Sequence, residues 1–292
     1  MKTKDNTDQY FILGNKYYQQ KDYGKALEAF NQFIEINLNY AKAYSKRADT
    51  YKALEQFNQA IIDYSKAIEL EPNSAMDYCN RGDAYYYNDQ LEEAISDYSK
   101  AIEINPDFAL AYCRKADALY HLEQVEKAIT DYTKAIELDP EYVDAYINRG
   151  NTYASLEKLE EAITDYNKAI KLEPTYALAY SNRADAFYYK GELDKAITDY
   201  TKAIELDSDF AVAYSSRADC YSSLGWLDKA LSDYTKAIEL DPEDDTFYYS
   251  RGLAYREQGK IKQAISDFQQ SLALNQDANV EQTLKDTLLL LE

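Results

Sequence analysis

Hydrophobic and small residues along the chain recur at helical spacing in two successive stretches, and this two-helix pattern repeats. In one segment, residues 143–176, the first stretch has Tyr146, Gly150 and Tyr153 at steps of four and three. The second stretch keeps the same spacing through Ala162, Ile163, Tyr166, Ala169 and Ile170. Apolar positions at this spacing line one face of an α-helix. We therefore predict a pair of amphipathic helices, A and B, in each segment, with helix A ending near residues 156–158.

Proline marks the interval at which the helix pair returns. It stands at Pro72, Pro106, Pro140, Pro174 and Pro242, and Ser208 fills the one gap. The interval is 34 residues, and counting proline as position 32 gives eight units: 7–40, 41–74, 75–108, 109–142, 143–176, 177–210, 211–244 and 245–278. Proline ends helix B because it disfavours the helical conformation of the residue before it. No Gly-, Ser- or Pro-rich spacer interrupts the units, so we expect one solenoid domain.

Both ends of the chain fall outside the repeats. Residues 1–6 are polar, and we expect a short N-terminal tail there. Residues 279–292 have leucines at steps of four and three, at Leu284, Leu288 and Leu291. This spacing predicts a C-terminal capping helix over the open face of the last unit. Leu289 and Leu290 exceed what a cap needs, which leaves two explanations: self-association, or a chain that continues further.

Seven positions of each unit resemble the tetratricopeptide repeat, a 34-residue helix–turn–helix unit. In residues 143–176 these positions, 4, 8, 11, 20, 24, 27 and 32, are Tyr146, Gly150, Tyr153, Ala162, Tyr166, Ala169 and Pro174. The resemblance covers 272 of the 292 residues (8 × 34). It implies an all-α fold, an α-solenoid in which eight helix-turn-helix units stack into a right-handed superhelix with helices A inside. It also implies a protein–protein interaction scaffold with a concave groove.

Positions 7 and 23 carry opposite charges in units two to eight. Position 7 is basic, at Arg47, Arg81, Lys115, Arg149, Arg183, Arg217 and Arg251. Position 23 is acidic, at Asp63, Asp97, Asp131, Asp165, Asp199, Asp233 and Asp267. Unit one alone has Leu13 and Ala29 at these positions, and a buried cation without a partner is costly. We therefore expect an ion pair inside each repeat, with joint drift of a divergent end repeat as the alternative.

Composition narrows the class of partner. The chain has 52 acidic and 32 basic residues, a net charge of −20, which disfavours nucleic acid and anionic membrane surfaces. No signal peptide and no membrane-spanning apolar run is recognisable. Three cysteines, an odd number, favour a reducing compartment over a disulfide framework. We expect a cytoplasmic protein without membrane insertion.

Catalytic motifs are missing from the sequence. It has one histidine, no glycine-rich phosphate loop and no His-Glu-x-x-His pair. Cys113 and His121 share a predicted helix, but eight residues separate them by about 12 Å. Cys79 and Cys113 occupy equivalent places in adjacent repeats, which disfavours a disulfide or a shared metal, and Cys220 is expected in the core. We predict neither enzyme activity nor a cofactor or metal.

A second stripe on helix A contains the candidate binding residues. Of 31 tyrosines, most fall at framework positions, but seven lie at positions 5, 12 and 13 of helix A. Positions 2, 5, 6, 9, 12 and 13 share one helix face, and the resemblance implies that this face lines the peptide-binding groove. The stripe residues that we select are Tyr18, Lys42, Lys46, Asp49, Lys52, Asn80, Asp83, Tyr86, Tyr87, Arg114, Asp117, Tyr120, His121, Asn148, Asn151, Asn182, Asp185, Tyr188, Tyr189 and Asp219.

Asparagine at position 6 of three units, Asn80, Asn148 and Asn182, resembles the ladder with which some family members hold an extended peptide backbone. A carboxamide has donors and an acceptor, which matches a backbone amide. Solvated polar residues on an open face are the alternative. Aspartate at position 9 either orients these asparagines or selects a basic ligand.

Charge along the stripe suggests a ligand polarity. Five basic and eight acidic residues give the stripe a net charge of −3, so most of the excess acidity lies elsewhere. Lys42, Lys46 and Lys52 predict a preference for an acidic ligand end near unit two, whereas Asp185 and Asp219 predict basic or neutral sequence near the C-terminal units. The position-9 acids of units two to four can offset those lysines and remove the preference.

Two classes of function follow from these features. The first is a non-catalytic scaffold or adaptor that binds an extended or helical segment of a protein or peptide ligand in the groove. The second is a structural element that self-assembles into homo-oligomers through the ends of the solenoid.

Overall fold

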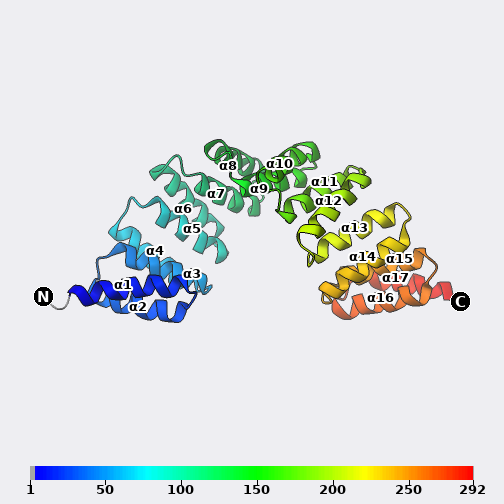
Figure 1. Cartoon of the computed structure of the whole chain (residues 1–292), viewed down its shortest axis with the longest axis horizontal. Coiled ribbons are helices and arrows are strands. Elements are labelled where there is room, and N and C mark those ends of the chain that lie inside the picture. Colours follow the sequence, from blue (N-terminus) through cyan, green and yellow to red (C-terminus); the bar gives the residue numbers. More distant parts are fainter. Residues whose placement is uncertain (1–3, 292) are drawn as a thin grey trace. The chain divides into compact units, whose positions relative to one another are not determined.

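The computed structural model describes residues 4–291, and all regular secondary structure in that range is helical. The A helices are α1 (Lys4–Gln19), α3 (Ala41–Ala53), α5 (Ala75–Tyr87), α7 (Ala109–His121), α9 (Val143–Ser155), α11 (Ala177–Tyr189), α13 (Ala211–Ser223) and α15 (Asp245–Glu257) (Figure 1). The B helices are α2 (Tyr23–Ile36), α4 (Phe57–Leu70), α6 (Leu91–Ile104), α8 (Val125–Leu138), α10 (Leu159–Leu172), α12 (Leu193–Leu206), α14 (Leu227–Leu240) and α16 (Ile261–Leu274). The predicted all-α fold of repeated helix pairs is confirmed.

The chain forms two compact units, Met1–Thr152 and Tyr153–Glu292, and their boundary falls within α9. Within each unit, helices A and B of one repeat pack together, and helix B packs on helix A of the next repeat. Examples are α5, α6 and α7 in the first unit and α11, α12 and α13 in the second. The single solenoid domain and its right-handed superhelix stay predictions.

The turn between helices A and B has the same backbone conformation in every repeat. Position 15 has a positive φ of 57–76° in all eight. Repeats six to eight have glycine there, for example Gly225, but repeats one to five have a residue with a side chain, for example Glu123. A left-handed conformation costs a residue with a Cβ roughly 1–2 kcal/mol. The first five turns are therefore strained relative to the last three.

Helices A and B pack closely because small residues face large aromatic ones. Alanines at positions 20 and 27 have no exposed surface, and the position-24 tyrosines are at most 2% exposed. At position 8, a Cβ on Gly82 would lie only 2.7 Å from the Tyr98 ring. The three cysteines belong to the same packed layers and are free thiols, so the prediction that Cys220 lies in the core is confirmed.

The ion pairs form inside the repeats, as predicted. The guanidinium of Arg47 donates from Nε and Nη2 to the two carboxylate oxygens of Asp63, at 2.6 and 2.7 Å. The same two-point geometry recurs in Arg81–Asp97, Arg183–Asp199, Arg217–Asp233 and Arg251–Asp267. Lys115 reaches Asp131 through a single contact of 3.0 Å. The ion pairs form within single repeats because each aspartate projects from helix B beside the cation on helix A of the same repeat.

A third guanidinium bond reaches the preceding repeat, which sequence reasoning did not foresee. Nη1 of Arg47 donates to Asn31, and Nη1 of Arg81 donates to Ser65, both at position 25 of the repeat before. Arg149, Arg183, Arg217 and Arg251 donate in the same way to Thr133, Asn167, Thr201 and Thr235. The arginine therefore connects each repeat to its neighbour while its charge is balanced inside its own repeat.

Both chain ends differ in detail from expectation. Helix α1 begins at Lys4, so residues 4–6 of the predicted tail are helical; residues 1–3 lie outside the described range. The capping helix is α17 (Ala278–Leu288), followed by the short 3₁₀ helix η1 (Leu289–Leu291). It packs on α16, with Val280 and Thr287 buried and Leu284 against Phe268.

The predicted apolar stripe of this capping helix is confirmed at Leu284 and wrong at Leu288. Leu288 is 43% exposed, and the side chain of Leu291 lies outside the described residues. The side chains that face α16 are instead Val280, Leu284 and Thr287, at steps of four and three, so Thr287 takes the place expected for Leu288.

Candidate functional site

Helix A positions 2, 5, 6, 9, 12 and 13, the A-helix stripe, hold the candidate binding residues. In the first unit, side-chain contacts connect this stripe from one repeat to the next. Nζ of Lys52 lies 3.1 Å from Asp83 and 3.4 Å from Asn80 on the next A helix. Nδ2 of Asn148 donates to Oδ1 of Asp117 at 2.9 Å. The structure therefore brings the predicted residues of α3, α5, α7 and α9 in this unit onto one connected surface.

The position-9 aspartates are held by buried tyrosines. The hydroxyl groups of Tyr64, Tyr98 and Tyr132 donate to Asp49, Asp83 and Asp117, at 2.6, 3.0 and 2.7 Å. Tyr200 and Tyr234 donate to Asp185 and Asp219 in the second unit. A buried phenol requires such a partner. Each tyrosine thus packs the helix pair with its ring and orients a stripe carboxylate with its hydroxyl.

Sequence reasoning missed this pair, although a signal was present. It treated the position-24 tyrosines as packing residues only. Aspartate occurs at position 9 only in units with tyrosine at position 24. The two units with phenylalanine there, Phe30 and Phe268, have Asn15 and Leu253 at position 9. That joint change would have identified the partner.

Stripe cations in the first unit lie against these acids. Lys46 contacts Asp49 at 2.7 Å, and Lys52 contacts Asp83 at 3.1 Å. Arg114 lies between two acids, with its Nε 3.7 Å from Asp83 and its Nη1 3.5 Å from Asp117. Lys42 is exposed. The lysine cluster therefore does not act as three separate cations, because two of its members are already in ion pairs.

Two adjoining pockets lie on the stripe between the third and fifth repeats. The first encloses about 290 Å³ and is lined by Tyr86, Asp117, Tyr120, His121, Tyr132, Asn148, Asn151 and Thr152. The second encloses about 160 Å³ and is lined by Asp83, Tyr86, Tyr87, Tyr98, Arg114 and Asp117. Tyr86 and Asp117 line both. We call this region the aromatic–amide site.

The aromatic residues of this site support one another. The ring of Tyr86 lies edge-on to His121 at 5.6 Å and to Tyr87 at 5.4 Å. Tyr87 also stacks on Phe57 of the preceding repeat, with centroids 5.7 Å apart. The Nε of Arg114 is buried and has no hydrogen-bond partner among the residues described. The site thus combines aromatic rings that contact one another with a buried Arg114 Nε that has no hydrogen-bond partner among the described residues.

In the second unit the stripe has a different electrostatic character. Asp185 and Asp219 accept hydrogen bonds from their tyrosines, and the structure of this unit places no basic side chain in contact with either carboxylate. Burial raises the pKa of both, outweighing those hydrogen bonds. Tyr188 and Tyr189 meet edge-on at 5.7 Å, and Tyr189 is 76% exposed. Asn182 also lies on this stripe, half-buried.

The cysteines are poor nucleophiles. All three are buried, and burial raises the pKa of Cys79 and of Cys220 to about 12. The described residues contain no group of three or more His, Cys, Asp or Glu placed to hold a metal ion. They also contain no helix long and apolar enough to cross a membrane.

Family models for the repeat match almost the whole chain. Models described as tetratricopeptide repeat match residues 8–40, 41–74, 75–108, 98–130 and 246–277, and a model described as TPR repeat matches 116–157, 150–188, 184–225 and 218–259. The chain belongs to the tetratricopeptide repeat (TPR) family. The resemblance inferred from the sequence is thereby confirmed, and TPR domains are typical protein-interaction modules. Curated protein sequences give no match to this chain.

Solved TPR structures resemble the chain in fold. A chain of the APC/C hetero-tetramer Cut9–Hcn1 is 19% identical, with a TM-score of 0.68; the alignment covers 91% of this protein but 52% of that chain, so this protein spans about half its length. A TPR protein from Parabacteroides merdae ATCC 43184 is 21% identical over 85% of this protein and 98% of its own chain, with a TM-score of 0.66. YrrB, described as a TPR protein with an unusual peptide-binding site, is 25% identical over 65% of this protein and 97% of its own chain, with a TM-score of 0.53.

Proposed function

We propose that this TPR protein is a non-catalytic scaffold that binds a segment of a partner protein along the A-helix stripe, with its main contact at the aromatic–amide site. The observation that supports this most directly is the pair of adjoining pockets that share Tyr86 and Asp117. Concave sites with apolar rings and a few well-placed polar groups are the usual form of a ligand site.

An extended segment fits this arrangement. Asn148 uses its amide nitrogen on Asp117, which directs its amide oxygen away from that acid and leaves it to accept from a ligand N–H. Tyr86 and Tyr120 line the same pocket and offer ring surface to a large apolar side chain. The ligand therefore presents backbone amides to the asparagine and one bulky side chain to the tyrosines.

Ligand polarity differs between the two units. In the first unit, Lys46, Lys52 and Arg114 are in ion pairs with stripe acids, so neutral sequence is favoured there. In the second, no described basic side chain contacts Asp185 or Asp219. A lysine or arginine of the ligand would supply a positive charge beside these carboxylates. We therefore propose neutral ligand sequence near the second repeat, in place of the acidic ligand end expected from the sequence. The preference for basic ligand sequence near the C-terminal repeats is kept.

A peptide-array screen with purified protein tests the site. The double variant Tyr86→Ala/Asn148→Ala removes the ring and the amide, and we expect it to lose at least about tenfold in affinity for peptides that the wild type selects. Lys100→Ala, an exposed change in α6, serves as the matched control and keeps its affinity. Unchanged affinity in the double variant would show that ligands bind elsewhere.

The polarity of the ligand is tested separately. Asp185→Asn/Asp219→Asn preserves shape and removes both charges, so peptides with Lys or Arg should weaken while neutral peptides keep their affinity. An equal effect on both peptide classes would contradict the charge argument and leave the aromatic–amide site unaffected.

A further inference from the structure

The fourth repeat departs from the others at two neighbouring positions of α7. Position 7 is Lys115, whereas repeats two, three and five to eight have arginine. Position 11 is Leu119, whereas every other repeat has tyrosine or phenylalanine. These positions lie one helical turn apart, so both changes affect the same patch of the helix.

In repeats three, six, seven and eight, these two side chains lie against each other beside the preceding helix B. The Arg81 guanidinium lies 5.8 Å from the Tyr85 ring centroid, and Arg217 lies 5.8 Å from Tyr221. The same arginines extend Nη1 to position 25 of the preceding repeat. A lysine has no such arm, and a leucine has no ring, so the fourth repeat cannot fill this space in the same way.

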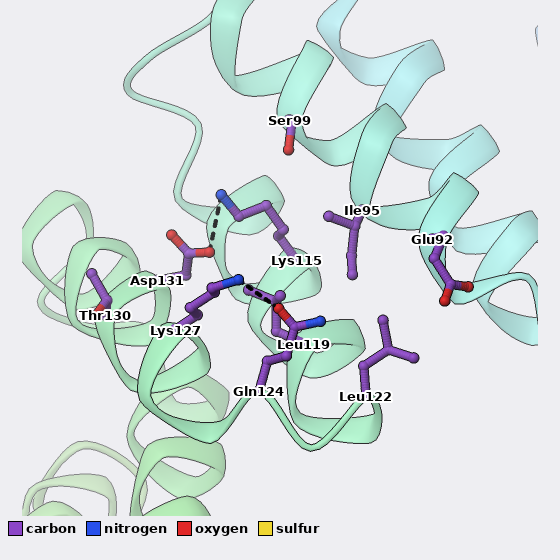
Figure 2. A pocket seen from close by; sticks show the side chains of 10 residues that line it. All are labelled: Glu92, Ile95, Ser99, Lys115, Leu119, Leu122, Gln124, Lys127, Thr130 and Asp131. Atoms are coloured by element: carbon purple, nitrogen blue, oxygen red, sulfur yellow. Dashed lines mark hydrogen bonds and ion pairs between the residues drawn. The ribbon is translucent and has the colours of Figure 1, made fainter.

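An open pocket of about 500 Å³ lies beside these two residues, between α6, α7 and α8, and we call it the outer pocket (Figure 2). Its lining is Glu92, Ile95, Ser99, Lys115, Leu119, Leu122, Gln124, Lys127, Thr130 and Asp131. Figure 2 shows the side chains of Ile95 and Leu122 at the space, with Leu119 beside Gln124. The hydroxyl of Ser99 also points toward it. The floor is therefore apolar, and its rim is polar.

Two polar groups of the outer pocket make fewer contacts than their counterparts in other repeats. Ser99 stands at position 25, where equivalent residues such as Ser65 receive the arginine Nη1. Asp131 has one oxygen bound to Lys115, whereas the arginine-paired aspartates use both. Burial raises the pKa of Asp131 against the stabilising contact with Lys115. A hydrogen-bonding group that entered here would find both a hydroxyl and a carboxylate oxygen.

The outer pocket is separate from the A-helix stripe. Lys115, Leu119 and Leu122 lie at positions 7, 11 and 14, whereas Asp117 and Tyr120 lie at 9 and 12. At 100° per residue, these two sets fall on opposite faces of α7. A ligand in this pocket therefore leaves the aromatic–amide site accessible.

We propose that the outer pocket binds a tyrosine side chain of a partner protein. The ring would lie against Ile95, Leu119 and Leu122, beside the place that an aromatic residue takes at position 11 of the other repeats. The phenol hydroxyl is both donor and acceptor, so it complements Ser99 and the free oxygen of Asp131. The lining has two basic and two acidic side chains, which favours this neutral ring over a charged one. The volume lies within the usual range for ligand sites.

The test uses 4-methylphenol, the tyrosine side-chain analogue, and the full chain with ¹³C-labelled isoleucine and leucine methyl groups. We expect saturable shifts of the Ile95 and Leu122 methyl signals, and weaker binding of toluene, which lacks the hydroxyl. Lys115→Arg/Leu119→Tyr restores the residues of the other repeats and should fold at least as stably. This variant should bind 4-methylphenol at least about tenfold more weakly.

A reverse exchange controls for unspecific phenol binding. Arg81→Lys/Tyr85→Leu gives the third repeat the residues of the fourth and should open an equivalent pocket beside Ser65. Its signature is a new saturable shift of Ile61, the counterpart of Ile95. The proposal would be overturned if the wild-type shifts were spread equally over Ile61 and Ile129. It would also be overturned if Lys115→Arg/Leu119→Tyr bound 4-methylphenol as well as the wild type does.

Discussion

Arg217 and Asp233 are joined by two parallel hydrogen bonds, Nε to Oδ2 at 2.7 Å and Nη2 to Oδ1 at 3.0 Å. Both belong to the seventh repeat, and both are largely shielded from water, at 14% and 12% side-chain exposure. The third arginine nitrogen donates to Thr201 of the sixth repeat. One side chain thus balances a buried acid and connects two repeats, which a lysine cannot do with the same geometry.

Removing only the acid of this pair should cost more than removing both partners. Asp233→Ala leaves the cation of Arg217 without its carboxylate, and we expect a loss of about 2 kcal/mol or more in unfolding free energy. Arg217→Leu/Asp233→Ala introduces the pair found in the first repeat, Leu13 and Ala29, and should cost less. Urea unfolding of both variants measures the difference. If the double variant lost more unfolding free energy than Asp233→Ala, the expectation that Arg217 depends on its pairing with Asp233 would be refuted.

Relief of turn strain should stabilise the protein. Glu123 has a φ of 58°, whereas Gly225 adopts the same turn with a φ of 71°. Glu123→Gly removes the Cβ strain but gains chain entropy in the unfolded state, so we expect a net gain of about 0.5–1 kcal/mol. Gly225→Ala is the reciprocal control and should destabilise by a similar amount. Thermal unfolding of the two variants should therefore shift the melting temperature in opposite directions.

Asp219 gives the protein a pH-dependent stability of defined sign. Burial raises its pKa above 3.8. An acid whose pKa is higher in the folded protein binds its proton more tightly in that state. Its contribution to the stability of the folded state therefore falls as the pH rises from its pKa in the unfolded chain through its pKa in the folded protein. Asp219→Asn should therefore be more stable than wild type near neutral pH, with the difference shrinking toward about pH 4.

The matched control for Asp219 lies in the same repeat. Asp233→Asn weakens an ion pair with Arg217, so it should lower stability near neutral pH rather than raise it. Chemical unfolding at both pH values reports the two signs. If Asp219→Asn destabilised the protein near neutral pH, the hydrogen bond from Tyr234 would outweigh the burial of the charge.

Deletion of the capping helix should loosen the eighth repeat before any other. Val280 and Leu284 of α17 cover Ala264 and Phe268 of α16. Without residues 279–292, these core side chains meet water, and in a repeat protein the effect decays with distance from the exposed interface. Hydrogen exchange should show α15 and α16 losing protection first. Equal loss along the whole chain would mean that the repeats unfold as one cooperative unit.

The sequence by itself determined the repeat length, the helix pairs and the partner of six position-7 cations, from Arg47 to Arg251. These features are local, and eight copies in register reinforce them: Pro72 and Pro106 mark one interval, and the exception of Leu13 with Ala29 reveals a pair. The helix bounds follow from the same periodicity, because the amphipathic stripe marks the helical residues that pack against the same repeat and the next.

Only the tertiary structure decided how side chains meet across that framework. The bond from Tyr132 to Asp117, the pairing of Lys52 with Asp83 and the third bond of Arg81 to Ser65 depend on the rotation of one helix against its neighbour. The outer pocket is of the same kind, since its lining comes from three helices that only packing brings together. A linear period states which residues recur, but the reach and direction of each side chain are set by packing between helices.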